Sequence, residues 1–88
     1  MKIAWSPRAI RHLIAIRECI ERDSPADAAP AAGRIIEAID VLQTQPQLGR
    51  PGRLTGTRNL VVPETPYIVP YRVRNERLEL LGVLDRRR

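Results

Sequence analysis

Residues that hold metals or form disulfides are scarce in this sequence. Among 88 residues there is one cysteine, Cys19, and one histidine, His12. A single cysteine forms no internal disulfide, and the chain has no paired acids at ligand spacing to complete a metal site. We therefore expect no disulfide, no metal and no other cofactor. His12 and Cys19 are both expected to be ordinary helix residues, because neither has the sequence neighbours of a catalytic triad.

Aromatic residues and long hydrophobic runs are also few. The chain has no phenylalanine, and its aromatic residues are Trp5, Tyr67 and Tyr71, so the core is expected to consist of isoleucine, leucine, valine and alanine. No apolar run is long enough for a signal peptide or a membrane span, which predicts a cytoplasmic protein without a membrane partner. So short a chain encloses one core, which predicts a single domain over residues 1–88.

Lysine is nearly absent, although the chain is basic. Lys2 is the only lysine, so fourteen of the fifteen basic residues are arginine, against ten acidic residues and a net charge of +5. Arginine binds carboxylates and phosphates in a bidentate manner. The composition therefore favours an acidic partner and leaves open whether that partner is nucleic acid or protein.

The N-terminal residues predict a short edge strand followed by a helix. Residues 2–5 form the strand, Ser6 is a good N-cap, and Pro7 suits the first helical position. The helix is expected from Arg8 to about Arg22. Its apolar residues recur at three- and four-residue steps, as expected for one buried face: Ile10, Leu13, Ile14, Ile16 and Ile20.

A second helix is predicted to follow and to end at about Gln45, before Pro46. Pro30 lacks the backbone N–H and clashes with the carbonyl four residues earlier. We therefore expect a kink there or a late helix start near Ala29. Two antiparallel helices of this kind need a sheet against which to bury their common apolar face.

The second half of the chain predicts that sheet. A glycine-, proline- and arginine-rich loop at 49–57 leads into extended segments at 58–62, 67–74 and 77–84, separated by turn residues. The predicted fold is α+β, with an N-terminal helical hairpin packed on a small antiparallel sheet. Alternation places Tyr67, Val69, Tyr71 and Val73 on the core face, gives Leu78, Leu80 and Leu84 a common face, and leaves Leu81 and Val83 on the outer face for another protein.

The arginines are the main functional signal. On an antiparallel sheet they are expected to gather along one edge, as a phosphate-binding surface requires. Arg72 and Arg74 share a strand face with few neutralising acids, whereas residues 86–88 are equally consistent with a solvated tail. The residues expected to bind the target are Arg50, Arg53, Arg58, Arg72, Arg74, Arg86 and Arg87.

The order of these segments resembles the RelE/ParE superfamily of toxins from type II toxin-antitoxin systems. The segments that carry the resemblance are residues 5–9, 49–53, 58–62, 67–73 and 83–84, so it spans nearly the whole chain. It implies a cytoplasmic, growth-inhibiting toxin of a plasmid-stabilisation type, held in a hetero-oligomer by a cognate antitoxin. Leu81 and Val83 are where the antitoxin is expected to bind.

Members of the superfamily differ in their target, and the sequence favours one of them. RelE-like members cleave mRNA on the ribosome, whereas ParE-like members poison DNA gyrase. Aligned on residues 71–73, the basic catalytic positions of the RelE type fall on Asn59, Val61 and Ile68, and Asp85 stands where many members carry histidine. The remaining catalytic candidates are Arg72, Asp85 and Arg88, which make a weak assembly for proton transfer and phosphorane stabilisation.

The leading hypothesis is therefore a ParE-like toxin that acts on gyrase by binding. Ribosome-dependent mRNA cleavage is the enzymatic alternative. A basic nucleic-acid-binding module without toxicity is the third, and the lack of exposed aromatic residues and of a recognition helix weakens it.

Overall fold

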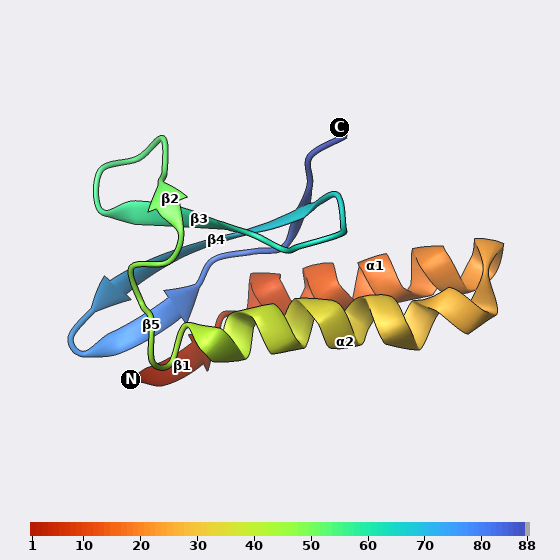
Figure 1. Ribbon diagram of the computed structural model, residues 1–88, viewed down its shortest axis with the longest axis horizontal. Helices are drawn as coiled ribbons and strands as arrows, with labels where there is room; N and C mark the ends of the chain where they lie inside the picture. The colour runs from red at the N-terminus through yellow and green to blue at the C-terminus, as the bar shows by residue number, and fades with distance from the viewer. Residues whose placement is uncertain (88) are drawn as a thin grey trace.

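The computed structural model describes residues 1–87, in which two helices cover one face of a β-sheet (Figure 1). The helices lie side by side and antiparallel, joined at Ser24, and together they form the layer beneath the strands. This arrangement confirms the predicted α+β class and the helical hairpin. The elements in chain order are β1 (Lys2–Trp5), α1 (Pro7–Asp23), α2 (Pro25–Val41), β2 (Arg50–Pro51), β3 (Thr57–Val61), β4 (Tyr67–Arg74), β5 (Arg77–Leu80) and β6 (Leu84–Asp85).

The sheet is mixed rather than purely antiparallel. The strand order is β1-β5-β4-β3-β2, and β6 pairs with the first residues of β4. The pairs from β2 to β5 are antiparallel, as predicted, but β1 runs parallel to β5. A parallel neighbour arises here because the chain returns to the edge at β1 only after both helices and three other strands. The predicted loop at 49–57 also contains the two paired residues of β2.

The first helix begins and ends close to its predicted bounds. The hydroxyl of Ser6 accepts a hydrogen bond from the backbone N–H of Ala9 at 3.0 Å, and Pro7 is the first helical residue. Ala9 is fully buried and belongs to the hydrophobic core. Leu13, Ile16 and Ile20 pack against the same core.

The second helix shows that the predicted late start near Ala29 is wrong. Helix α2 runs without interruption from Pro25 to Val41, with Pro30 inside it, and ends before the predicted Gln45. Proline at this position leaves the carbonyl of Ala26 without its helical donor. Ala26 and Pro30 are both exposed, so water can bind that carbonyl.

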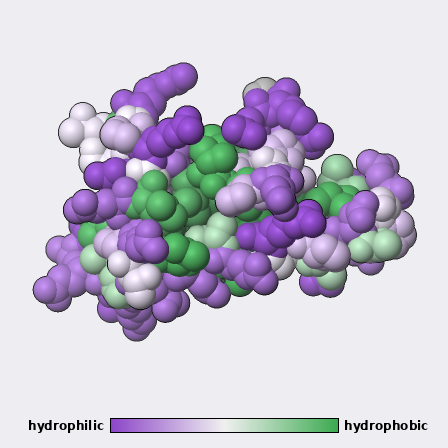
Figure 2. All heavy atoms as spheres, viewed as in Figure 1, coloured by the Kyte–Doolittle hydropathy of each residue, from purple (hydrophilic) through white to green (hydrophobic). Residues whose placement is uncertain are grey.

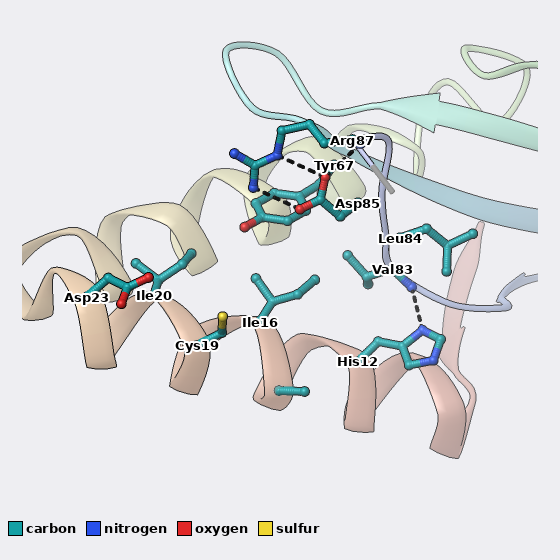
Figure 3. A pocket seen from close by; sticks show the side chains of 11 residues that line it. His12, Ile16, Cys19, Ile20, Asp23, Tyr67, Val83, Leu84, Asp85 and Arg87 are labelled. Carbon is teal, nitrogen blue, oxygen red and sulfur yellow. Dashed lines mark hydrogen bonds and ion pairs between the residues drawn. The ribbon is translucent and has the colours of Figure 1, made fainter.

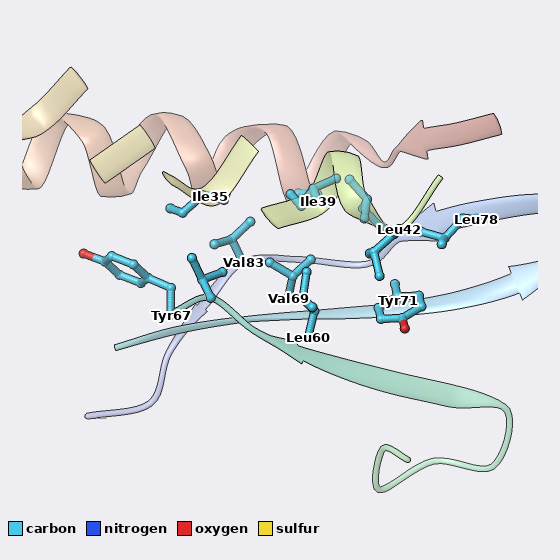
Figure 4. Close-up of a cluster of buried hydrophobic side chains, with 12 residues drawn as sticks. Ile35, Ile39, Leu42, Leu60, Tyr67, Val69, Tyr71, Leu78 and Val83 are labelled. Carbon is cyan, nitrogen blue, oxygen red and sulfur yellow. The ribbon is translucent and has the colours of Figure 1, made fainter. Parts of the chain in front are cut away.

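The hydrophobic core lies between the helices and the inner face of the sheet (Figure 4). Tyr67, Val69 and Tyr71 alternate along β4 and are buried, which confirms the predicted core face of that strand. Val73 continues the alternation but is exposed, because it lies past the part of the sheet that the helices cover. The remaining core residues are mainly aliphatic, as expected: Ala9, Ile35, Ile39, Leu42, Leu60, Val62, Leu78, Leu80 and Val83.

The segment after β5 departs from the predicted strand. Strand β5 ends at Leu80, and residues 81–83 form no strand before β6 begins. The interruption shifts the alternation, so Val83 is buried at 3% exposure and Leu84 is exposed at 45%. The prediction that Leu84 shares the inner face with Leu78 and Leu80 is therefore wrong.

Candidate functional site

The outer face of the sheet, on the side away from the helices, carries the central arginines. Arg72 and Arg74 alternate along β4 with the inward-facing residues Tyr71 and Val73, so both lie on the outer face. Register places Arg72 between Thr57 of β3 and Glu79 of β5. The predicted outward position of these two arginines is confirmed.

Arg50 lies on the same face, whereas Arg58 does not. Register pairs Arg50 with Asn59, which in turn pairs with Pro70 in the outward-facing set of β4. Arg58 pairs with Tyr71 and therefore lies on the inner side. Its guanidinium donates hydrogen bonds to the carbonyls of Gly49 at 2.8 Å and Gln47 at 3.3 Å. The expectation that Arg58 joins the outward arginines is wrong, because its side chain holds the loop that precedes β2.

Two other groups of arginines lie away from the centre of the sheet. Arg53 lies in the exposed turn between β2 and β3. Asp85 pairs with Tyr67, the first residue of β4, whereas Arg74 is the last. The C-terminal tail is therefore about seven residues along β4 from Arg74, or roughly 23 Å. In Figure 1 the last described residues and the turn between β4 and β5 lie at opposite ends of the sheet.

The tail arginines are held by their neighbours. Arg86 donates hydrogen bonds from its backbone N–H to the carbonyl of Pro66 at 2.8 Å and from its guanidinium to the carbonyl of Thr65 at 3.3 Å. Arg87 binds both carboxylate oxygens of Asp85, at 3.1 and 2.8 Å. This hydrogen-bonded pair raises the pKa of Arg87. Residues 86 and 87 are thus fixed against the sheet rather than extended as a loose tail.

The three catalytic candidates do not form one site. Asp85 lies beside Tyr67, about five residues along β4 from Arg72, which is roughly 17 Å. Arg72 is engaged with Glu79 and Asp85 with Arg87. Arg88 lies outside the described residues. Within residues 1–87, the structure therefore gives no proton-transfer group next to Arg72 other than Glu79.

Glu79 links the two central arginines. Its carboxylate oxygens lie 2.7 Å from the Nε of Arg72 and 3.4 Å from a terminal nitrogen of Arg74. The hydrogen bond from Arg72, more than any other interaction, lowers the pKa of Glu79 below its usual value. Glu79 is therefore ionised and paired at neutral pH.

Replacing Glu79 with glutamine is expected to destabilise the protein at neutral pH but not in acid. A lowered folded-state pKa stabilises the folded protein above the ordinary carboxyl pKa of about 4.3, and this stabilisation is lost as the pH falls through the folded-state value. Thermal midpoints of wild type and Glu79→Gln should therefore differ at neutral pH and converge in acid. Glu37→Gln is the control, since Glu37 on α2 forms no ion pair within residues 1–87. A difference that persisted unchanged in acid would contradict the ion-pair explanation.

The predicted outer position of Val83 is wrong, and other residues form the exposed apolar surface. Val83 is part of the core, and Leu81 is half-buried, its N–H bonded to the carbonyl of Pro70 at 2.8 Å. Register instead aligns Val61, Ile68 and Leu84 in one row across β3, β4 and β6.

A second apolar surface lies where β3 meets the end of α2. We call it the β3-edge groove, a cavity of about 280 Å³. Figure 2, which has the same view as Figure 1, shows hydrophobic surface in the middle of the molecule. The sequence alone did not predict this groove. Its one local sign is Leu48, an apolar residue in a polar loop. The groove is lined by Ala38, Val41, Leu48, Leu60, Val61 and Pro63, with Arg50 and Asn59 beside them.

The edge of β3 next to this groove is open. Strand β2 pairs with β3 only at Arg58 and Asn59. In an antiparallel strand, alternate residues direct their backbone groups to the same side, so Val61 directs its N–H and C=O to the side on which Asn59 pairs with Arg50. Within residues 1–87 no strand continues β2 to meet Val61. An extended segment can therefore add there, with side chains entering the groove.

A larger pocket, of about 530 Å³, lies between α1 and β6 (Figure 3). On its α1 side, His12 accepts a hydrogen bond at Nδ1 from the backbone N–H of Val83 at 3.1 Å. His12 thus satisfies the backbone N–H of Val83, which lies beyond the residues of β5 that pair with β1. The prediction that His12 is an ordinary helix residue missed this contact, because a separation of 71 residues leaves no local sequence signal. Residues 1–87 contain no cluster of side chains suited to a metal ion.

Comparison with known proteins places this arrangement in a family. The family described as "ParE toxin of type II toxin-antitoxin system, parDE" matches residues 3–88. The Y4kP protein of Sinorhizobium fredii is 45% identical over 83 residues, which are 94% of this chain and 85% of that protein. Toxin RelE2 of Caulobacter vibrioides is 38% identical over 72 residues, covering 82% of this chain and 80% of that protein.

Solved structures agree with these sequence matches. A chain from the chromosomal ParDE toxin-antitoxin system of P. aeruginosa superposes with a TM-score of 0.89 at 27% identity, covering 97% of this chain and 95% of that one. A chain of the toxin-antitoxin complex RelBE2 from Mycobacterium tuberculosis has a TM-score of 0.64 at 22% identity, covering 97% and 96%, and shows a common fold. No helix within residues 1–87 is long and apolar enough to cross a membrane.

The helical hairpin, the arginine-bearing sheet and a family match over nearly the full length agree with one another. This chain belongs to the ParE toxin family of type II toxin-antitoxin systems.

Proposed function

We propose that this toxin inhibits growth by binding DNA gyrase in the cytoplasm, and that a cognate antitoxin neutralises it within a hetero-oligomer. The observation that supports binding over catalysis is the engagement of Glu79. It is the acid beside Arg72 and Arg74, and their hydrogen bonds keep it ionised. A general acid or base for RNA cleavage needs a pKa near the working pH. The pKa of Glu79 is instead lowered, which moves it further from neutral pH.

The outward arginines are the proposed contacts with the target. Arg50, Arg72 and Arg74 share the outer face, and Arg53 lies in the exposed turn beside β2. Arg86 and Arg87 form a separate contact at the far end of β4, where Asp85 orients Arg87. Arg58 leaves this set, because its guanidinium is bound to the carbonyls of residues 47 and 49.

The β3-edge groove is the proposed antitoxin site, in place of Leu81 and Val83. The open edge at Val61 offers backbone hydrogen bonds to an extended segment, and Val41 and Leu48 offer apolar contacts. Arg50 at the rim favours a segment that carries an acidic residue. The P. aeruginosa structure comes from a ParDE toxin-antitoxin system, which supports an antitoxin as the occupant.

Ribosome-dependent mRNA cleavage is the second candidate function. It is favoured by the 38% identity to a relative named toxin RelE2. The outer face of the sheet argues against it, because Asn59, Val61 and Ile68 occupy the positions where the resemblance places basic catalytic residues. None of these side chains can stabilise a pentacovalent phosphate by charge.

Gyrase poisoning and mRNA cleavage are separated by one pair of assays. Purified toxin added to supercoiled plasmid, gyrase and ATP is expected to trap cleaved DNA, and an Arg72→Ala, Arg74→Ala double variant is expected to trap much less. Arg17→Ala, Arg34→Ala is the matched control, because both residues are on the helices, away from the outer face of the sheet. Codon-phased mRNA cuts in a translation extract, without trapped DNA, would reverse the assignment.

A further inference from the structure

Three cations lie in one row across the end of the sheet. Register places Arg77 of β5 opposite Lys2 of β1 on one side and opposite Arg74 of β4 on the other. We call these three residues the cationic row. Neighbouring strands are about 4.8 Å apart, so the row spans roughly 10 Å.

The turn between β4 and β5 fixes this alignment. Asn75 and Glu76 both have positive φ, 54° and 61°, as the two central residues of a type I′ turn require. A two-residue turn of this type sets the register of its strands, and the register places Arg74 directly opposite Arg77. Leu78, next to Arg77, is fully buried, so Arg77 faces outward.

The charge of the row is largely uncompensated. Lys2 and Arg77 form no side-chain hydrogen bond or ion pair within residues 1–87. Arg74 reaches Glu79 at 3.4 Å, but that carboxylate is held more closely by Arg72. Glu76, in the turn, forms no ion pair within the same residues. Like charges directly opposite on a sheet destabilise the fold, so this register has a cost in the free protein.

From this arrangement we propose that the cationic row binds the phosphate groups of a nucleic acid backbone. Arginine binds phosphate in a bidentate manner, and backbone contacts need charge rather than apolar surface. The row is exposed and polar, whereas a protein interface is expected to have a hydrophobic centre. The row is long enough to contact neighbouring phosphates, which rise by about 3.4 Å each along one strand of a duplex. Arg74 is shared with the proposed target contacts, whereas Lys2 and Arg77 lie outside that set, and the inference does not depend on which target the toxin has.

A short DNA duplex with a fluorescent label tests the proposal without gyrase or antitoxin. Binding of the purified toxin, followed by anisotropy at several salt concentrations, is expected to weaken in the Arg77→Gln variant. The slope of log affinity against log salt should become shallower by about 0.9 for each phosphate that the variant no longer neutralises. Arg34→Gln, on α2, is the control that removes the same charge. Equal effects of the two substitutions, or no binding by wild type, would overturn the proposal.

Thermal unfolding separates a binding role from a structural one. Because Arg77 faces like charges, Arg77→Gln is expected to keep or raise the thermal midpoint of the free protein. Added inorganic phosphate should raise the midpoint of wild type more than that of the variant, since a ligand of the folded state stabilises it. A lower midpoint in Arg77→Gln would instead assign the residue a structural role. Binding of poly-glutamate is measured in the same way. If it depends on Arg77 as strongly as DNA binding does, the row binds carboxylates rather than phosphates specifically, and the proposal is refuted.

Discussion

Replacing Tyr71 with alanine is expected to lower the free energy of unfolding by about 3 to 5 kcal/mol. Tyr71 is fully buried at the centre of β4, and its ring fills the space against Gly49. Its hydroxyl accepts a hydrogen bond from the N–H of Gly49 and donates one to the carbonyl of Pro46, both at 2.8 Å. Alanine leaves a cavity and two polar groups without their partner. Such a loss is a large part of the stability of a domain this small.

Tyr71→Phe separates the hydroxyl from the ring. It is expected to cost about 1 to 3 kcal/mol, because the buried N–H of Gly49 loses its acceptor. Urea denaturation followed by circular dichroism measures both variants. Val73→Ala is the control on the same strand, since Val73 is exposed and its truncation should cost less. A Tyr71→Phe variant as stable as wild type would show that water replaces the hydroxyl.

The same hydrogen bonds connect the core to the proposed antitoxin site. Tyr71 fixes the loop from Pro46 to Gly49, and Arg58 holds the same loop through two carbonyls. That loop carries Leu48 and leads directly into Arg50, which both line the β3-edge groove. Loosening the loop is therefore expected to weaken antitoxin binding as well as stability.

Placing acids in the β3-edge groove is expected to abolish neutralisation by the antitoxin. The Val41→Asp, Leu48→Asp double variant removes two apolar contacts and would bury charge in the complex. Central interface residues cost about 2 kcal/mol or more when truncated, so a loss of at least roughly 100-fold in affinity is expected for the pair. Both residues are exposed in the free toxin, so the fold should be retained.

Calorimetry with the purified antitoxin measures this loss directly. Leu54→Asp and Ile14→Asp are the controls, because both are exposed apolar residues outside the groove. In cells, the groove variant should arrest growth even when the antitoxin is co-expressed, whereas the controls should be rescued. Wild-type affinity in the groove variant would place the antitoxin elsewhere on the toxin.

The sequence predicts those helices and strands whose position depends on interactions between residues close together in the chain. Ser6 and Pro7 mark the start of α1, and period-two alternation identifies the inner face of β4. The predicted late start near Ala29 is wrong because proline removes one backbone hydrogen bond, which packing of the buried face of α2 outweighs. The prediction for Val83 fails because the irregular segment after Leu80 shifts the alternation, and Gly82 is the local sign of that irregularity.

The candidate site is less predictable than the fold, because its contacts join distant parts of the chain. The sequence indicates that Arg72 and Arg74 face outward together, and the structure confirms it. The inward position of Arg58 depends on the register between β3 and β4, which the positions of the arginines along the chain do not reveal. The pairing of Lys2 with Arg77 depends on a parallel contact between strands more than seventy residues apart.

The most direct test of binding against catalysis is a titration. Increasing amounts of toxin are added to a fixed amount of gyrase with supercoiled plasmid and ATP, and the cleaved DNA is measured over time. If the toxin acts by binding, cleaved DNA should level off at a fixed ratio of toxin to gyrase and should not rise with longer incubation. Intact gyrase activity, together with mRNA in a translation extract that is progressively cut by toxin far below the ribosome concentration, would contradict a binding mechanism.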